Sequence, residues 1–183
     1  DIIYDCLRMF ENSIPEKPSL TFELPPRYVM ATLHRAEAVD DARHLRSILH
    51  SLATSPFPII LPVHPRTRKM IDRYNLQSVI SNNFLLTDPV GYTDLLSLLR
   101  SSEFVVTDSG GVQREAVYFD KHVYVARPET EWRELEESGY VKVVGYDFDL
   151  SRGIPPFGQP LVDLANLMRP ASKSMAEVLK SLF

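Results

Sequence analysis

Polar side chains with acid, base or anion-binding chemistry follow several short apolar runs of the chain. In order along the sequence they are His34 with Arg35, then His64, then Ser109 with Gly110 and Gly111. A histidine can supply a proton or a hydrogen bond near neutral pH. A glycine pair lets backbone N–H groups approach an anion with no Cβ between them. These residue types together suit a phosphate or diphosphate ligand.

The glycine pair stands between an apolar run and a segment with a helical pattern. We expect it to supply the positive φ that an immediate turn from strand to helix needs. Ser109 would add its hydroxyl, and the dipole of a helix from residue 111 onward would place about half a positive charge there. A Gly-Gly turn is also common as plain structure, and that interpretation stays open. A hydrolase nucleophile is disfavoured, because Ser109 lacks the Gly-x-Ser-x-Gly context.

Glu115 lies four residues beyond Gly111, on the same side of the expected helix. A carboxylate can accept hydrogen bonds from two ribose hydroxyls, as acidic residues do in other nucleotide-binding folds. The alternative is a solvated glutamate that stabilises the first turns of its helix. His34 and His64, taken singly, could equally be structural. They do not make up a metal site by themselves, and we expect no metal and no cofactor.

Six apolar runs rich in Val, Ile, Leu and aromatic residues predict strands. They cover residues 28–33, 58–63, 84–87, 104–107, 122–126 and 141–144, and helical patterns separate them at 41–52, 66–74, 92–100, 111–119 and 131–137. Continuous apolar runs are typical of a parallel sheet that is covered on both faces. The sequence therefore predicts an α/β domain with a doubly wound, mainly parallel six-stranded sheet of Rossmann type.

Both ends of the chain also carry helical patterns. Residues 1–9 look like an amphipathic helix already in progress at Asp1, so we expect the chain to begin inside a longer polypeptide. After a Pro/Gly-rich loop at 153–160, two C-terminal helices are expected at about 161–168 and 172–182. We interpret residues 1–183 as a single domain.

The predicted parallel sheet implies that the polar residues form one site. In an open parallel sheet, ligands bind beyond the carboxyl ends of the strands. Five polar segments each follow a predicted strand, at residues 32–37, 62–67, 87–92, 108–112 and 127–132. We therefore expect all of them at one edge of the sheet, whereas residues placed by chance would divide between both edges.

Bulk composition excludes several classes of partner. The chain has 183 residues, 44% of them hydrophobic, and a net charge of −4, so no broad basic field attracts nucleic acid or anionic lipid. The single cysteine, Cys6, excludes an internal disulfide, and no apolar run approaches the roughly 20 residues that cross a bilayer. We expect a cytoplasmic location with no membrane or nucleic-acid partner.

Several ordered segments resemble the non-hydrolysing UDP-N-acetylglucosamine 2-epimerase family. They are Thr32-Leu-His-Arg-Ala-Glu37, Pro62-Val-His-Pro-Arg-Thr67, Asp88-Pro-x-x-Tyr92, Thr107-Asp-Ser-Gly-Gly-Val-Gln-Arg-Glu-Ala116 and Thr130-Glu-Trp-Arg-Glu-Leu135, followed by Glu137-Ser-Gly139 and Val144-Gly145. The resemblance covers residues 1 to about 145. It implies a two-domain GT-B-like enzyme with its substrate between two Rossmann-like halves, of which this chain resembles the second.

The resemblance also implies roles for individual residues. In the family, UDP is eliminated across C1 and C2 of the sugar to give a 2-acetamidoglucal, and is then added back with C2 inverted. The implied UDP contacts are Ser109, Gly110 and Gly111 for the diphosphate, Glu115 for the ribose, and Val90 and Leu95 for the uracil, with Arg35 and His64 in the same site. His34 would be the catalytic residue that assists departure of the diphosphate.

The chain departs from the family pattern at a few positions. Ala36 and Ala38 stand where many bacterial members have Arg and Asn that help to hold a second, regulatory sugar nucleotide. Trp132 replaces a common Arg, so its neighbours Glu131 and Arg133 are further candidates for the site. The resemblance implies that the family's carboxylates for proton transfer at C2 belong to the missing N-terminal domain. We therefore expect this chain alone to bind UDP weakly and not to epimerise a UDP-sugar.

The resemblance further implies a homodimeric full-length parent in cell-surface polysaccharide biosynthesis. Two other functions remain open. One is the nucleotide-sugar-binding domain of a GT-B glycosyltransferase, which product analysis with a sugar acceptor would separate. The other is a non-enzymatic nucleotide-sugar binding module, which the length of the open reading frame would separate.

Overall fold

The computed structural model describes residues 2–152, and in this part six strands form one sheet in the order β3-β2-β1-β4-β5-β6. The strands are β1 (Val29–Thr32), β2 (Ile59–Pro62), β3 (Phe84–Thr87), β4 (Phe104–Thr107), β5 (Val123–Val125) and β6 (Val141–Val143). Every neighbouring pair is parallel. The predicted strands and parallel sheet are confirmed, with strand ends shifted by one residue at most.

The helices are α1 (Ile2–Phe10), α2 (Ala36–Val39), α3 (Ala42–Ala53), α4 (Pro65–Arg73), α5 (Tyr92–Ser101), α6 (Gly110–Tyr118) and α7 (Arg133–Glu137). Two 3₁₀ turns, η1 (Glu11–Ser13) and η2 (Gln77–Val79), complete the described part. Each helix predicted between strands is confirmed, although α7 begins two residues later than expected. The short turns α2, η1 and η2 were not predicted. The helices expected at 161–168 and 172–182 lie outside the described residues.

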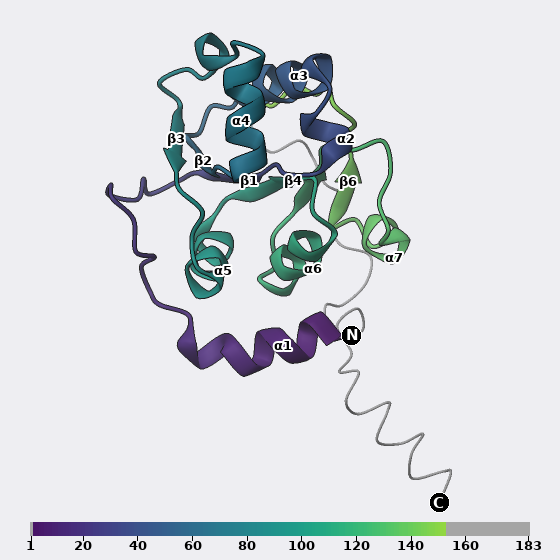
Figure 1. Cartoon of the computed structure of the whole chain (residues 1–183). Coiled ribbons are helices and arrows are strands. Elements are labelled where there is room, and N and C mark those ends of the chain that lie inside the picture. The colour runs from purple at the N-terminus through teal and green to yellow at the C-terminus, as the bar shows by residue number, and fades with distance from the viewer. Residues whose placement is uncertain (1, 153–183) are drawn as a thin grey trace, which may run out of the picture.

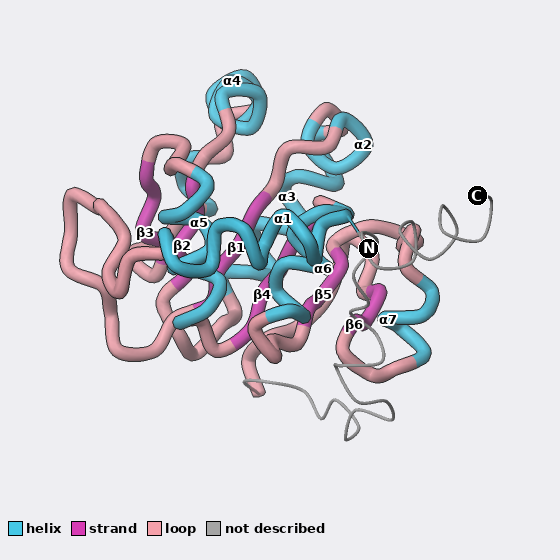
Figure 2. The backbone as a smooth tube through the Cα atoms, turned by 90° about the horizontal axis from the view of Figure 1, so that it is seen from below, coloured by secondary structure: helices cyan, strands magenta, loops and turns pink. Residues whose placement is uncertain are grey.

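Helices cover both faces of the sheet, as a doubly wound domain requires. Figure 1 shows α2, α3 and α4 on one face and α1, α5 and α6 on the other, and Figure 2 gives the second face from below. Alternate residues of β1 enter different cores: Val29 and Ala31 pack with α3 and α4, whereas Met30 packs with α5 and α6. Because neither face of the central strands meets water, their sequences read as continuous apolar runs.

The order in which strands are added to the sheet reverses between β1 and β4. The chain moves outward from β1 to β2 and β3, and then returns to place β4 on the other side of β1. Thr32 and Thr107, the last residues of β1 and β4, are paired in register, with their Oγ1 atoms 2.6 Å apart. Connections from such a point leave on opposite faces, so a crevice opens between them at the carboxyl edge.

Residues 146–152 return to α3, on the face of the sheet that α2 and α4 also cover. Tyr146 stacks on His44 with ring centroids 4.0 Å apart, and the N–H of Phe148 donates to Oγ of Ser51 at 3.0 Å. Leu150 is fully buried in this core. None of the helices within residues 2–152 has the length and apolar character that crossing a bilayer requires.

Candidate functional site

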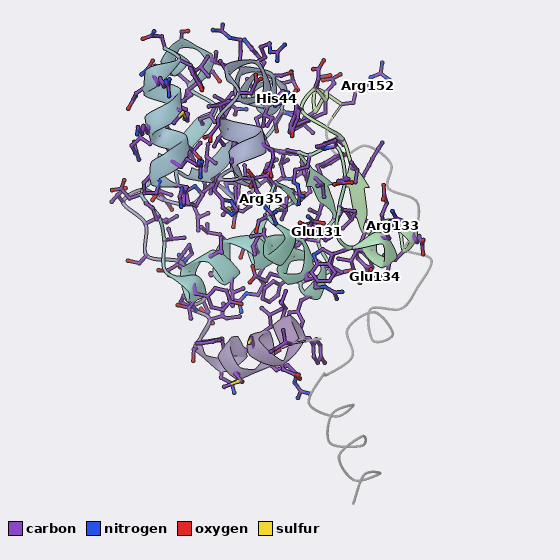
Figure 3. The ribbon with its side chains drawn as sticks, turned by 45° about the vertical axis from the view of Figure 1, so that its right-hand side comes forward. Arg35, His44, Glu131, Arg133, Glu134 and Arg152 are labelled. Atoms are coloured by element: carbon purple, nitrogen blue, oxygen red, sulfur yellow. The ribbon has the colours of Figure 1, made fainter. Side chains whose placement is uncertain are left out.

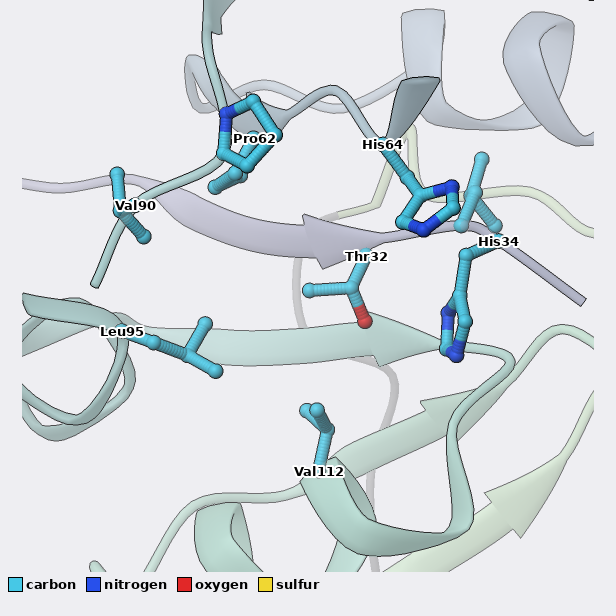
Figure 4. A pocket seen from close by; sticks show the side chains of 9 residues that line it. Thr32, His34, Pro62, His64, Val90, Leu95 and Val112 are labelled. Atoms are coloured by element: carbon cyan, nitrogen blue, oxygen red, sulfur yellow. The ribbon is translucent and has the colours of Figure 1, made fainter. Parts of the chain in front are cut away.

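A cavity of about 220 Å³ opens at the carboxyl edge of the sheet, between β1, β2 and the helices α5 and α6 (Figure 4). Its lining residues are Thr32, Leu33, His34, Pro62, His64, Pro89, Val90, Leu95 and Val112. The wall is apolar except for a hydroxyl and two imidazoles, which suits a flat ring next to a polar group. Four residues expected in one site, His34, His64, Val90 and Leu95, therefore lie together. Within residues 2–152, no three His, Cys, Asp or Glu side chains converge on a point where a metal ion could sit.

His34 is held by a buried carboxylate that sequence reasoning did not single out. Asp108 is fully buried, and its Oδ2 accepts hydrogen bonds from the backbone N–H groups of His34 and Arg35, both at 2.7 Å. Oδ1 of Asp108 lies 3.0 Å from Nδ1 of His34. This contact raises the pKa of His34 above its ordinary value of 6.5, while partial burial and the Arg35 charge lower it. The sequence did offer a signal for this role, because Asp108 directly follows a buried strand at the point where the strand order reverses.

His64 ends the loop after β2 and caps α4. Its Nδ1 accepts a hydrogen bond from the backbone N–H of Arg66 at 3.1 Å, and Pro65 takes the first helical position, where no N–H is needed. The rings of His34 and His64 lie 5.8 Å apart, tilted by 46° (Figure 4). The hydroxyl of Thr67 donates to the carbonyl of Leu33, which ties α4 to the loop after β1. Two neighbouring loops thus bring both imidazoles to one wall.

The turn from β4 into α6 is built differently from the expectation. The helix begins at Gly110, one residue earlier than predicted, and Ser109 is its N-cap with φ −93° and ψ 126°. Neither Gly110 nor Gly111 has a positive φ; among the described glycines, only Gly139 and Gly145 do. The expectation of a positive φ at the glycine pair was therefore wrong. An extended N-cap residue followed directly by helical residues turns the chain without a left-handed conformation.

Glycine is favoured at positions 110 and 111 for different physical reasons. A Cβ on Gly110 would lie 3.2 Å from Oε2 of Glu131 and 3.4 Å from Nε1 of Trp132, so these two side chains would have to shift by a few tenths of an ångström to admit it. At Gly111 the nearest such atom is Oγ of Ser109 at 3.9 Å. The first N–H groups of a helix have no acceptor within it. Gly111 therefore leaves the start of α6 accessible to an anion.

Arg35 and Glu131 meet on the side of the site nearest β5. Nη2 of Arg35 lies 3.0 Å from Oε1 of Glu131 (Figure 3). Nη1 of Arg127 lies 2.7 Å from the same oxygen. Burial raises the pKa of Glu131, but the two guanidinium groups outweigh it and hold that pKa below its ordinary value. Neither Arg35 nor Glu131 lines the cavity. The pair instead forms a charged border beside Gly110.

Trp132 packs against the start of α6 and holds it by a hydrogen bond. Its Nε1 donates to the carbonyl of Gly110 at 2.8 Å, and the guanidinium of Arg114 lies 3.8 Å from the centre of its ring. Arg114 also pairs with Glu134. Arg133 is exposed as the first residue of α7 and does not line the cavity. A role for Arg133 in place of the missing family Arg stays a prediction.

Glu115 is buried on α6, one turn beyond Val112, and does not itself line the cavity. Only 9% of it is exposed, and its Oε1 accepts a hydrogen bond from the hydroxyl of Tyr92 at 3.0 Å. Burial raises the pKa of Glu115, and the Tyr92 hydrogen bond opposes that rise. The alternative of a solvated helix-stabilising glutamate was therefore wrong. Tyr92, which sequence reasoning did not assign, also packs edge-on against Phe10.

Comparison with known proteins places this chain in a recognised group. The family model for UDP-N-acetylglucosamine 2-epimerase matches residues 1–149. A UDP-2,3-diacetamido-2,3-dideoxy-D-glucuronate 2-epimerase of Pseudomonas aeruginosa is 43% identical over 126 residues, which are 67% of this chain and 34% of that protein. A UDP-N-acetylglucosamine 2-epimerase homolog of Methanococcus maripaludis is 38% identical over 151 residues, 79% of this chain and 42% of that protein.

A solved structure agrees with these sequence matches. The UDP-GlcNAc 2-epimerase of Methanocaldococcus jannaschii, in complex with UDP-GlcNAc and UDP, aligns with a TM-score of 0.69 and 27% identity. The alignment covers 97% of this chain and 49% of that protein. The chain thus spans between about a third and a half of the length of these relatives.

Proposed function

Because the chain belongs to the UDP-N-acetylglucosamine 2-epimerase family, we propose that it is the UDP-binding half of an enzyme that epimerises a UDP-sugar at C2. One observation carries the proposal. The apolar cavity, the two imidazoles and the open start of α6 all meet where the strand order reverses. A nucleoside diphosphate needs an apolar slot next to anion-binding donors, and this edge of the sheet offers both.

Helix α6 would contact all three parts of UDP. Its first turn offers the N–H groups of Gly110 and Gly111 to the diphosphate, and Val112 forms cavity wall for the base. Glu115, one turn further, has a carboxylate for the ribose hydroxyls. Val90 and Leu95 lie in the same cavity and would contact the uracil, the former through its backbone. Arg35 and Glu131 would border the diphosphate.

His34 is the residue that we assign to the chemical step. Elimination breaks the bond between C1 and the diphosphate oxygen, so negative charge develops on that oxygen. A protonated His34, favoured by its Asp108 contact, would donate a proton or hydrogen bond to the departing oxygen. The electron pair that forms the C1–C2 double bond comes from the C2–H bond. We assign the base that removes this proton to the half of the enzyme that precedes the chain.

The reaction therefore needs a second domain, and the isolated 183-residue chain is expected to bind UDP without epimerising any UDP-sugar. The chain covers less than half of the length of each of these relatives, which supports this expectation. Incubation of the chain with UDP-N-acetylglucosamine in D₂O, followed by proton NMR, should show neither the C2 epimer nor deuterium at C2. Turnover or deuterium incorporation would contradict the half-enzyme proposal. The family match makes the glycosyltransferase alternative the weaker one, and dimerisation of the parent stays a prediction.

A methyl group at Gly111 should separate binding from folding. The new Cβ of Gly111→Ala would make only an ordinary contact with Oγ of Ser109 at 3.9 Å, and the change removes a poor helix former. The free energy of unfolding should therefore stay equal or rise by at most about 1 kcal/mol, and the melting temperature should not fall. The new methyl group stands where the diphosphate approaches, so UDP affinity should fall at least about tenfold, which corresponds to about 1.4 kcal/mol. Calorimetric titration and thermal denaturation measure the two effects.

Gly110→Ala is the matched variant for this test. Its methyl group would meet Glu131 and Trp132, so it should lower the melting temperature as well as the affinity. If Gly111→Ala binds UDP as tightly as the unmodified chain, the diphosphate does not sit at the start of α6.

A further inference from the structure

The two histidines of the cavity contact opposite kinds of partner through the same ring atom. Nδ1 of His34 faces the carboxylate oxygen Oδ1 of Asp108 at 3.0 Å, whereas Nδ1 of His64 faces the backbone N–H of Arg66 at 3.1 Å. We infer that the neutral rings carry opposite tautomers, with the proton on Nδ1 in His34 and on Nε2 in His64. Asp108 is then a positioning residue that acts through His34.

The tautomer of His34 follows from the surroundings of Asp108. That carboxylate is fully buried, and its Oδ2 already accepts two backbone N–H groups. Its Oδ1 is buried without a hydrogen-bond partner among residues 2–152, and Nδ1 of His34 at 3.0 Å is the donor that lies close to it. An ionised carboxylate can only accept, so the ring atom that faces it must carry the proton. The lone pair of neutral His34 is consequently on Nε2.

The tautomer of His64 follows from the cap of α4. A backbone N–H can only donate, so the Nδ1 that receives the Arg66 N–H must be unprotonated. The single proton of the neutral ring is then on Nε2. A proton added to Nδ1 would face the Arg66 N–H and break the cap.

The opposite tautomers give the histidines different roles, and this step rests on the proposed function. A diphosphate oxygen accepts hydrogen bonds, so neutral His64 can donate to it through Nε2 directly. Neutral His34 presents a lone pair at Nε2 and can donate only after it takes up a proton. UDP binding should therefore draw one proton onto Nε2 of His34. In the reaction, that same proton passes to the oxygen released when the C1–O bond breaks.

The charged groups around His34 favour this proton uptake. Asp108, from the connection between β4 and α6, raises the pKa of His34, and Arg35, the next residue along the chain, lowers it. The third titratable group that faces the ring is His64, from the connection between β2 and α4, at 5.8 Å between ring centroids. Of these groups, Asp108 lies against Nδ1 and both orients the ring and raises its pKa.

Nitrogen NMR on the ligand-free, ¹⁵N-histidine-labelled chain tests the inference without any UDP. At pH 8, long-range proton–nitrogen correlations should show a protonated Nδ1 in His34 and a protonated Nε2 in His64. In Asp108→Asn the amide oxygen should keep the two backbone N–H groups, so the NH₂ group turns toward His34. That donor should switch His34 to the Nε2–H tautomer and lower its pKa relative to the unmodified chain.

Asp88→Asn, at the same edge of the sheet, is the control and should leave both rings unchanged. The same tautomer in both histidines, or an unaltered His34 in Asp108→Asn, would overturn the inference. If Asp108→Asn does not fold, the spectrum of the unmodified chain still decides it, because both tautomers are read there directly.

A calorimetric experiment with UDP tests the coupling between UDP binding and proton uptake by His34. It also allows the tautomer inference and the proposed function to be judged separately. Titration at pH 7.5 in buffers of different ionisation enthalpy should show net proton uptake, and Asp108→Asn should lose it. His34→Gln measures the part that comes from the phosphate of UDP itself. Uptake that is equal in all three proteins would overturn the coupling. Absence of UDP binding would contradict the proposed function, while the tautomers would still be judged from the ligand-free spectra.

Discussion

Replacement of Glu115 by Ala should weaken UDP binding by about ten- to a hundredfold, because a hydrogen bond to a charged group contributes about 1.5–3 kcal/mol. The carboxylate is 9% exposed, and one of its oxygens is engaged by the Tyr92 hydroxyl. We propose that the other oxygen accepts a hydrogen bond from a ribose hydroxyl. Calorimetric titration of the unmodified and variant chains with UDP measures the difference.

The ligand itself can show whether Glu115 contacts the ribose hydroxyls. The diphosphate of 2′,3′-dideoxyuridine should bind the unmodified chain more weakly than UDP does, and the Glu115→Ala chain should no longer distinguish the two. Tyr92→Phe removes the hydroxyl that holds Glu115 and should cost less affinity than Glu115→Ala. Glu103→Ala is the matched control, since Glu103 precedes β4 at the opposite edge and pairs with Arg27. Equal UDP affinity of the unmodified and Glu115→Ala chains would remove Glu115 from the site.

Replacement of Asp108 by Ala should cost about 3 kcal/mol in free energy of unfolding, because it leaves two backbone N–H groups without their shared acceptor. For a domain of this size the melting temperature should fall by roughly 6–12 °C. Part of the loss should depend on pH. The raised pKa of His34 means that its contact with Asp108 stabilises the fold fully below pH 6.5, the ordinary pKa, and less as the pH rises through the folded pKa. The variant should therefore lose more stability at pH 6 than at pH 9.

The control for this prediction is Asp88→Ala. Asp88 follows β3 at the same edge, but its side chain is 90% exposed and pairs only with the exposed Arg68. Such pairs contribute about 0–1 kcal/mol, so the melting temperature should barely change. If both variants melt together, or if the loss at Asp108 is the same at pH 6 and pH 9, then Asp108 does not hold His34 in the way that the structure indicates.

The architecture could be predicted from the sequence because its strands are buried on both faces. Runs such as Phe104–Thr107 are apolar without alternating polar residues, and the helices between them carry clear apolar periodicity. The four-residue helix Ala36–Val39 could not be predicted, since it is too short to show a period. The conformation of the glycine pair was also predicted wrongly. The extended N-cap Ser109 makes the turn instead, and Gly110 is favoured by the close approach of Glu131 and Trp132, a tertiary contact that no local pattern contains.

The candidate site was predictable in outline and not in its contacts. His34, His64, Val90 and Leu95 do converge, because parallel strands send their following residues to one edge. The sequence could not show that Arg35 pairs with Glu131, about a hundred residues away, instead of lining the cavity. Nor could it show which carboxylate orients His34, although Asp108 stood beside Ser109 in the same motif.

The central claim is that UDP binds at the carboxyl edge of the sheet between β1 and β4. A titration of the ¹⁵N-labelled chain with UDP, followed by backbone amide correlation spectra, tests it most directly. The account predicts that the largest shifts fall on the amides of Gly110 and Gly111, with further shifts at His34 and Val90. Shifts confined to the opposite edge, around Arg27 and Glu103, or no shifts at millimolar UDP, would contradict it.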